Sequence, residues 1–388
     1  MYGAIMNSFL TVAKENNFVL PDYKNSNLSI IKDIANRKGS RTGKKEKKIF
    51  LLVDGLGYDL ANLLAEEGGV DFLKSYSFEK ISTLYPSTTG AVLPSLETGL
   101  TPSEHGMVGW YVYSKELGTV VAPYRDIPAF SRDCRLSKAG IPSMVPQPDL
   151  LFMAKDRNVM LLFDEMINNP PGDGNITLAL KRYAIQSDMA IKLRDEVKNG
   201  KYDFIFAYYT SIDHLEHKYG PRSEATINGA TLLLNELEKV LLPALDKSDY
   251  NLVITADHGH TAVKKWIKMD SKSKIMNYLS GPPWGDARIM FLNVASGQES
   301  AIEKYVAERY SKYSILEESD ALINTGIFGK KKVNENIIYR FGTHTLIAKD
   351  HVAFNYEYPK NVPSNDVNSI GLHSGLSREE MEVPLIVV

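Results

Sequence analysis

The sequence lacks several features that would indicate a specialised class of protein. Cys134 is the only cysteine in 388 residues, which excludes an intrachain disulfide framework and a cysteine-based zinc site. No apolar run approaches the roughly 18 residues of a membrane helix. The formal net charge is only -2, so composition gives no reason to expect a nucleic acid or an anionic membrane as partner. Residues 1–17 show no clear export signal, and we expect a cytoplasmic protein whose oligomeric state the sequence leaves open.

Three apolar runs are each followed, within a few residues, by an aspartate. They are "IFLLVDGLG" (49–57), "YDFIFAYYTSID" (202–213) and "YNLVITADHGH" (250–260), and such runs are typical of strands buried on both faces. Helices are predicted between them at 59–67, 182–198 and 224–242. This alternation predicts an α/β fold with a doubly wound, mostly parallel sheet. Ligands bind outside the carboxyl ends of such strands, where Asp54, Asp213 and Asp257 are expected.

Two regions interrupt this alternation. Residues 107–180 are rich in Pro, Gly and aromatic residues and are predicted to form an inserted cap that covers a site. Residues 286–350 are predicted to form a small α/β subdomain, and the segment 344–359 is predicted to be a hairpin around Lys349 and Asp350. We expect one catalytic domain over residues 1–388 with these two insertions.

The segment "DHLEH" contains the first candidate pair of metal ligands. Asp213 and His217 are four residues apart, so a helix beginning near Asp213 would present both on one face to one ion. His214 and Glu216 fall off that face and are weaker candidates. A solvated helix start with an aspartate cap explains the segment equally well when it is taken alone.

Further candidates lie near the end of the third run and near the carboxyl terminus. "ADHGH" offers Asp257 and His258, with His260 beyond them, and "GLHSG" places His373 in a glycine-flanked loop. An isolated histidine of this kind is more often structural. Together with Asp54 and the first pair, however, these residues are enough nitrogen and oxygen ligands for two sites with open positions.

A hydroxyl-rich segment precedes a possible helix. "YPSTTGAVLPSLETGLTPSEHG" (85–106) contains Ser87, Thr88 and Thr89, and residues 90–99 can be helical. A threonine at a helix amino terminus lies where backbone N–H groups favour an anion. Coordination to a metal would lower the pKa of its hydroxyl and make it a nucleophile. The alternative is an ordinary N-cap threonine.

The order of these motifs resembles the alkaline phosphatase superfamily, and most closely the nucleotide pyrophosphatase/phosphodiesterase type. The segment 85–106 matches that family's nucleophile segment up to its Thr-Gly-Leu-x-Pro-x-x-His-Gly end, and "DHLEHKYGP" and "ADHGH" match two further motifs. The resemblance implies an alkaline phosphatase-like fold with Thr89 as the nucleophile. It implies two groups of metal ligands, which are Asp213, His217 and His373 for one ion and Asp54, Asp257, His258 and Thr89 for the other.

The implied function is a phosphodiesterase or nucleotide pyrophosphatase that forms a phosphothreonine intermediate on a two-zinc site, with Mn²⁺ or Mg²⁺ as alternatives to zinc. The substrate would be a small phosphate ester or a nucleotide. A phosphomonoesterase, a phosphate mutase and a non-enzymatic metal-binding protein remain alternatives. One departure bears on the choice, because the family's phosphate-binding Asn three residues after the threonine corresponds here to Val92. We therefore expect another donor, or a different way of holding the phosphate.

Overall fold

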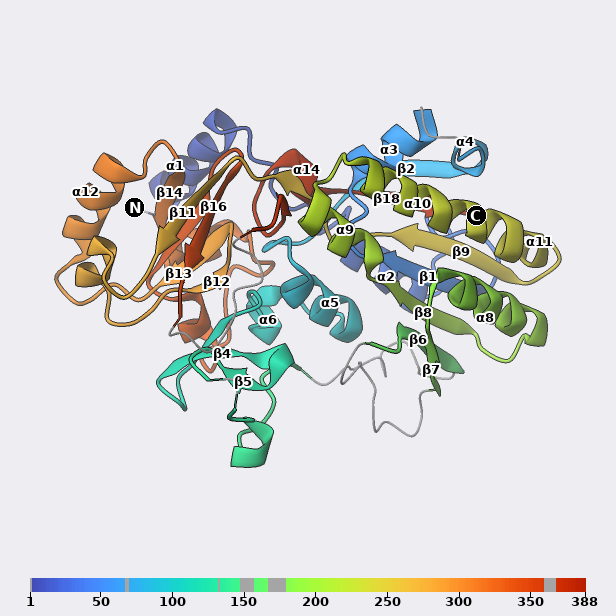
Figure 1. Ribbon diagram of the computed structural model, residues 1–388, viewed down its shortest axis with the longest axis horizontal. Coiled ribbons are helices and arrows are strands. Elements are labelled where there is room, and N and C mark those ends of the chain that lie inside the picture. The colour runs from blue at the N-terminus through green and yellow to red at the C-terminus, as the bar shows by residue number, and fades with distance from the viewer. Residues whose placement is uncertain (1, 67–69, 132, 147–156, 167–178, 359–367) are drawn as a thin grey trace.

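A seven-stranded sheet forms the centre of the molecule (Figure 1). The computed structural model describes residues 2–66, 70–131, 133–146, 157–166, 179–358 and 368–388. The strands in order across the sheet are β2 (Ser77–Ser82), β18 (Glu382–Val387), β9 (Tyr250–Thr255), β1 (Lys47–Val53), β8 (Phe204–Tyr209), β6 (Val159–Asp164) and β7 (Ala179–Tyr183). β18 pairs antiparallel with both of its neighbours, and the other pairs are parallel. The mixed α/β class with a large, mostly parallel sheet is confirmed.

The apolar runs become the most deeply buried strands. Every residue of β8 and β9 is buried, as is all of β1 except Lys47, because helices cover both faces of the sheet. The helices that connect or flank these strands are α2 (Asn27–Ala35), α3 (Tyr58–Glu66), α5 (Thr89–Thr98), α8 (Gln186–Asn199), α9 (Ser211–Tyr219), α10 (Glu224–Glu236) and α11 (Leu242–Leu245). Figure 1 shows α8 beside the continuous run of α10 and α11 along one face.

Local sequence sets the helix ends. α10 begins after Ser223, whose hydroxyl oxygen accepts a hydrogen bond from the Thr226 N–H at 3.2 Å, which satisfies one of the free donors of the first turn. α8 ends at Gly200, where φ is +63°, a conformation that only glycine adopts without strain. The three predicted helices are present as α3, α8 and α10, close to their predicted bounds. α10 continues through a π-helical turn, η3 (Leu237–Leu241).

Smaller sheets lie beside the main one. An antiparallel sheet has the order β12 (Trp284–Asp286), β13 (Ile289–Leu292), β15 (His344–Ala348) and β14 (Ser314–Glu318), and two helices accompany it, α12 (Glu299–Arg309) and α13 (Ser319–Thr325). The remaining strands pair as β11 (Lys265–Met269) with β16 (Val352–Tyr356), β10 (Thr261–Ala262) with β17 (Gly371–Leu372), and β3 (Val112–Ser114) with β4 (Thr119–Ala122) and β5 (Ile127–Pro128). The other helical segments are α1 (Tyr2–Glu15), α4 (Phe72–Ser75), α6 (Pro102–His105), α14 (Arg378–Met381), η1 (Pro123–Arg125), η2 (Ser137–Ala139), η4 (Lys274–Tyr278) and η5 (Ile338–Phe341).

The structure differs from the sequence-based expectation in two places. β6 lies inside the range 107–180 but belongs to the central sheet, so this range contains a core strand as well as the β3–β5 sheet. The predicted hairpin at 344–359 is wrong, because β15 pairs with β13 and β14 while β16 pairs with β11 in another sheet. The division into one domain with two insertions stays a prediction. In the described part of the chain, no helix is long and apolar enough to cross a membrane.

Candidate metal centres

The central sheet brings the strand-end carboxylates together. β1 lies between β8 and β9, with Val53 opposite Tyr209 and Leu52 opposite Thr255. Asp54 therefore follows its strand at the same level as the residues that leave the two neighbouring strands. The backbone fixes this arrangement, because the Asp54 N–H donates to the Tyr209 carbonyl oxygen at 2.8 Å and the Asp213 N–H donates to the Asp54 carbonyl oxygen at 3.1 Å.

Helix α9 starts immediately after β8 and carries Asp213 and His217 on one face, as the i and i+4 spacing predicts. The helix approaches so close to β1 that a Cβ at position 55 would lie 2.9 Å from the Asp213 Cα atom. Gly55 also has φ of +81°. A glycine after Asp54 is therefore required both by this turn and by the close passage of α9.

A two-residue ribbon brings His373 to the site. β17 ends at Leu372, which pairs with Thr261 of β10, so the residues just outside the ribbon, His260 and His373, are neighbours. Their ring centroids are 5.0 Å apart. This pairing joins segments about a hundred residues apart in sequence, and it also brings in His260, which sequence reasoning left outside the ligand set.

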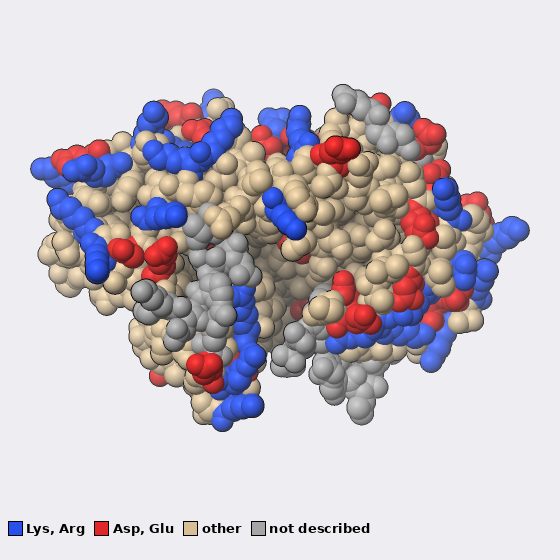
Figure 2. Space-filling view, in the orientation of Figure 1, with Lys and Arg blue, Asp and Glu red and all other residues tan. Residues whose placement is uncertain are grey.

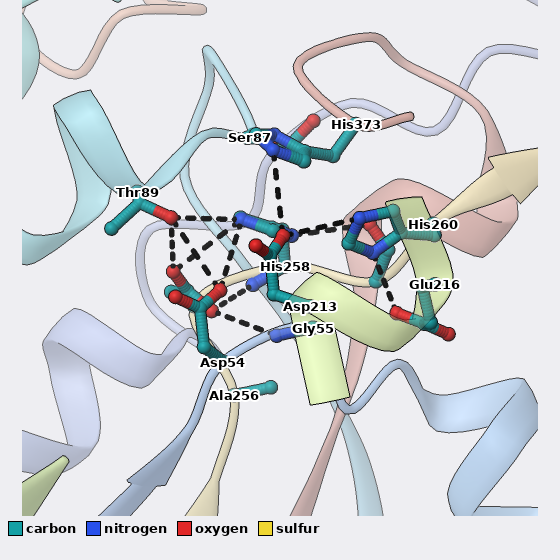
Figure 3. A network of polar contacts seen from close by, with 12 residues as sticks. Asp54, Gly55, Ser87, Thr89, Asp213, Glu216, Ala256, His258, His260 and His373 are labelled. Atoms are coloured by element: carbon teal, nitrogen blue, oxygen red, sulfur yellow. Dashed lines mark hydrogen bonds and ion pairs between the residues drawn. The ribbon is translucent and has the colours of Figure 1, made fainter. Parts of the chain in front are cut away.

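Three side chains surround the Thr89 hydroxyl and form with it what we call the Thr89 centre (Asp54, Thr89, Asp257 and His258). Thr89 Oγ1 lies 2.9 Å from Asp257 Oδ2, 3.1 Å from His258 Nε2 and 3.5 Å from Asp54 Oδ1. His258 Nε2 lies 3.5 Å from Asp54 Oδ1 and 3.4 Å from Asp257 Oδ2. A tetrahedral ion with bonds of 2.0–2.1 Å has ligand atoms about 3.3 Å apart, so all of these separations fit one such ion (Figure 3).

The second group is the Asp213 centre (Asp213, His217, His260 and His373). Its potential ligand atoms all lie within 4.8 Å of one another. Asp213 Oδ1 lies 3.2 Å from His217 Nε2, 3.2 Å from His260 Nε2 and 3.7 Å from His373 Nε2. The ligand atoms of Asp213, Asp54 and His258 also lie within 4.8 Å of one another. Asp213 therefore lies between the two centres.

The histidines present the same ring nitrogen to the centres. The Nδ1 atoms of His217, His373 and His258 face the carbonyl oxygens of Gly371, Ser87 and Gly259 at 2.9, 3.2 and 3.3 Å. A carbonyl oxygen only accepts, so each Nδ1 carries the proton and each Nε2 keeps its lone pair. Outer contacts of this kind orient histidine ligands in metal sites.

The electrostatics of the site favour a cation. Burial raises the pKa of the Asp54 carboxyl well above its usual value, and the nearby carboxylates of Asp257 and Asp213 raise it further. Burial lowers the pKa of His373 well below its ordinary value, with His258 adding to this effect. A divalent ion would relieve the repulsion among these carboxylates and bind the imidazoles of His258 and His373, whose lowered pKa keeps them neutral. The donor set of carboxylate oxygens and imidazole nitrogens suits zinc.

The neighbouring hydroxyls are placed differently from Thr89. Ser87 is fully buried and donates its hydroxyl to the Gly375 carbonyl oxygen at 2.7 Å. Thr88 is the N-cap residue of α5, but its side chain makes no cap hydrogen bond with the first N–H groups of this helix. Thr89 is the first helical residue, so it is not the N-cap residue of α5.

Val92 lies in the sheet core and is fully buried. It does not line the pocket beside Thr89. Val92 therefore offers no contact to a substrate in this pocket, and the expectation of another phosphate donor stays a prediction.

A pocket of about 640 Å³ opens beside both centres. Besides Thr89, Asp213 and His373, the side chains on its wall include Trp110, Tyr111, Arg125, His214, Lys218 and Asp286. His214 is exposed on α9, which agrees with its exclusion from the ligand face. Tyr208 lies at the base, where its hydroxyl donates to Asp54 Oδ2.

The comparison with protein families agrees with this geometry. Residues 48–138 and 154–375 match the type I phosphodiesterase/nucleotide pyrophosphatase family. The chain belongs to this family. As a member of the type I phosphodiesterase/nucleotide pyrophosphatase family, within the alkaline phosphatase superfamily, it is a hydrolase that acts on phosphoric ester bonds.

Solved structures share the fold at low sequence identity. Murine ectonucleotide pyrophosphatase/phosphodiesterase 5 is 16% identical with a TM-score of 0.62, and the match covers 88% of this chain and 87% of that one. Phosphonoacetate hydrolase from Sinorhizobium meliloti 1021, in complex with phosphonoacetate, is 14% identical with a TM-score of 0.64, with 90% and 91% covered. No curated protein matches the sequence. These likenesses support the fold, and the family match supports the class of reaction.

Proposed function

We propose that the protein hydrolyses a phosphodiester or phosphoanhydride of a small molecule, such as a nucleotide, through attack of Thr89 Oγ1 on phosphorus. The two centres would hold two divalent cations, for which we propose zinc. The observation that carries this proposal is the position of Thr89 Oγ1, 2.9–3.5 Å from three ligand atoms and at the amino terminus of α5.

The chain's own groups prepare the nucleophile and the phosphate. The Thr89 hydroxyl donates to Asp257 Oδ2, which fixes its rotamer. The N–H groups of Thr89 and Gly90, which the Thr88 side chain does not cap, lie at the positive end of the helix dipole and can bind non-bridging phosphate oxygens. When bound, the cations would lower the pKa of the hydroxyl and neutralise charge on the phosphoryl oxygens.

In the first step, the Thr89 hydroxyl gives up its proton to water and its oxygen forms a bond to phosphorus, while the bond to the leaving oxygen breaks and that oxygen departs as an anion or takes up a proton from water. In the second step, water hydrolyses the resulting threonine phosphoester and restores the hydroxyl. For a diester substrate the intermediate keeps one organic group on phosphorus, and for a monoester it is phosphothreonine.

The pocket wall favours an anionic substrate with a planar group. Arg125 and Lys218 contribute positive charge, and Trp110 and Tyr111 contribute aromatic surface. The Arg125 guanidinium carbon lies 5.7 Å from the centre of the Trp110 ring, which holds the charge beside the pocket. A structural neighbour, an inactive variant of murine ectonucleotide pyrophosphatase/phosphodiesterase 5, contains AMP. Figure 2 shows basic and acidic side chains interspersed over the face of the molecule that is turned to the viewer in Figure 1, which suits a small substrate better than a polynucleotide.

The test is paired steady-state kinetics on zinc-loaded protein with bis-p-nitrophenyl phosphate and p-nitrophenyl phosphate. The proposal predicts a higher kcat/KM for the diester. Thr89→Ala should lower kcat by at least about 10³-fold, whereas the matched control Thr88→Ala should keep most of the activity. A preference for the monoester would favour a phosphomonoesterase. Activity on neither compound, with zinc bound, would favour a mutase or a non-enzymatic protein.

A further inference from the structure

His260 lies at the Asp213 centre, although the ligand set implied by sequence contains only Asp213, His217 and His373. Its side chain is buried and its Nε2 lies 3.2 Å from Asp213 Oδ1, the same distance as His217 Nε2. Neither Asp213 Oδ1 nor His260 Nε2 makes a hydrogen bond with a described residue. Two buried ligand-type atoms thus face each other at ion-pair distance without hydrogen-bond geometry, which is the arrangement expected around a missing cation.

The three imidazoles of this centre are evenly arranged. The ring centroids of His217, His260 and His373 are 4.8, 5.0 and 5.1 Å apart. The Asp213 oxygen lies 3.2–3.7 Å from each of the three Nε2 atoms, close to the edge of about 3.3 Å of a tetrahedron around zinc. One carboxylate oxygen and three nitrogens therefore occupy positions suited to four ligands of a single ion.

A buried carboxylate forms an ion pair with the outer nitrogen of His260. Glu216 Oε2 lies 2.6 Å from His260 Nδ1, without hydrogen-bond geometry, and both side chains are almost completely buried. Glu216 stands three residues after Asp213 on α9, so the same helix turn supplies a ligand and the group that orients another ligand. A carboxylate on the outer nitrogen fixes the tautomer and raises the basicity of the inner one. Figure 3 shows His260 between Glu216 and the rest of the centre.

We propose that His260 is a fourth protein ligand of the cation at the Asp213 centre and that Glu216 is its positioning residue. This inference rests on the proposed two-cation function. Four protein ligands complete a tetrahedron, so the ion at this centre is held without a free position and meets a substrate oxygen only by expanding its coordination. The Thr89 centre differs, because its fourth ligand is the nucleophile itself. The two cation sites are therefore unequal, one retaining its ion and one presenting the reacting group.

The experiment is titration of the metal-free protein with Zn²⁺ against a chromophoric chelator, which gives two affinities in the unmodified chain. Asp54→Asn weakens the Thr89 centre and isolates the other site. In that background, His260→Ala should weaken the remaining site by at least about 100-fold, and Glu216→Gln by about 10–100-fold. The matched control is His351→Ala, which removes an imidazole that contacts Thr261 of β10 and lies outside the cluster. Circular dichroism of each metal-free variant checks that the fold is retained.

Co²⁺ gives a second readout that does not depend on activity. Its visible absorption is intense in a four-coordinate tetrahedral site, weak at higher coordination, and shifts in wavelength with the ligand set. His260→Ala should therefore shift the band if one water replaces the imidazole and weaken it if two waters enter. Unchanged Zn²⁺ affinity and Co²⁺ spectrum in His260→Ala would overturn this inference and leave the proposed function standing. If the unmodified protein bound no divalent cation, both the inference and the proposed function would be contradicted.

Discussion

The buried ion pair between Arg288 and Glu380 should be essential to stability. Both side chains have no exposed surface. Arg288 Nε and Nη2 donate to the two carboxylate oxygens of Glu380 at 2.7 and 2.9 Å, and Nη1 donates to the Val352 carbonyl oxygen at 2.6 Å. The pair connects the start of β13 to α14, next to the loop that carries His373.

Glu380→Gln is the most informative change, because it keeps the shape and removes the charge. Glu380 also accepts the N–H groups of Gly375 at 2.7 Å and Ser377 at 3.1 Å. An amide has only one oxygen, so its NH₂ group would face donors from Arg288 or the backbone. The guanidinium would then be a buried charge without its partner. We expect a loss of about 3–5 kcal/mol in the free energy of unfolding.

The assay is urea denaturation of the metal-free protein, followed by circular dichroism, with a double-mutant cycle through Arg288→Met. The cycle should give a coupling energy of at least about 2 kcal/mol. Glu382→Gln is the matched control, because its partner Lys80 is exposed to solvent, and the pair should contribute less than about 1 kcal/mol. A loss below about 1 kcal/mol in Glu380→Gln, or simple additivity in the cycle, would refute the reasoning.

Three further predictions concern other side chains. Burial lowers the pKa of His105 to about 3, and its Nδ1 accepts a hydrogen bond from the Met107 N–H at 3.0 Å. Protonation of this side chain therefore favours the unfolded state. Its contribution to the free energy of unfolding is complete above pH 6.5 and decreases as the pH falls toward 3. Between pH 8 and pH 5, the free energy of unfolding of the metal-free protein should fall by about 2 kcal/mol less in His105→Gln than in the unmodified chain. Urea denaturation measures this, and an equal fall in both proteins would contradict the prediction. Tyr208→Phe removes the hydrogen-bond donor to Asp54 Oδ2 and should lower the Zn²⁺ affinity of the Thr89 centre by about 10-fold or more. Titration of the metal-free variant with Zn²⁺ against a chromophoric chelator measures this, and two unchanged affinities would contradict it. Arg125→Ala should lower kcat/KM for a charged diester by about 10–100-fold, mainly through KM, whereas unchanged KM would remove Arg125 from substrate binding.

The parts of the fold that sequence predicts are those determined by local pattern. Long apolar runs indicate buried strands, and in a parallel sheet the residue after each strand must lie at the carboxyl edge. Asp54, Asp213 and Asp257 follow from this argument. The i and i+4 spacing similarly places Asp213 and His217 on one face of α9.

The parts that sequence does not predict depend on pairing between distant segments. β15 and β16 are recognisable as strands, but their apolar pattern does not say which strands they join, and they join different sheets. β6 has a buried apolar sequence of its own, yet its Pro- and Gly-rich surroundings suggested an insertion. His260 joins the Asp213 centre only because β10 pairs with β17. The i and i+3 spacing of Asp213 and Glu216 was a signal that both lie toward one face.

The most direct test of the central claim is to trap the covalent intermediate on Thr89. Zinc-loaded protein is mixed with bis-p-nitrophenyl phosphate, quenched in acid within milliseconds, digested and analysed by mass spectrometry. The account predicts that the peptide containing Thr89 carries one p-nitrophenyl phosphoryl group, that fragmentation places it on Thr89, and that Thr89→Ala abolishes it. A modification on Ser87 or Thr88 in place of Thr89, or full turnover by Thr89→Ala, would contradict Thr89 as the nucleophile.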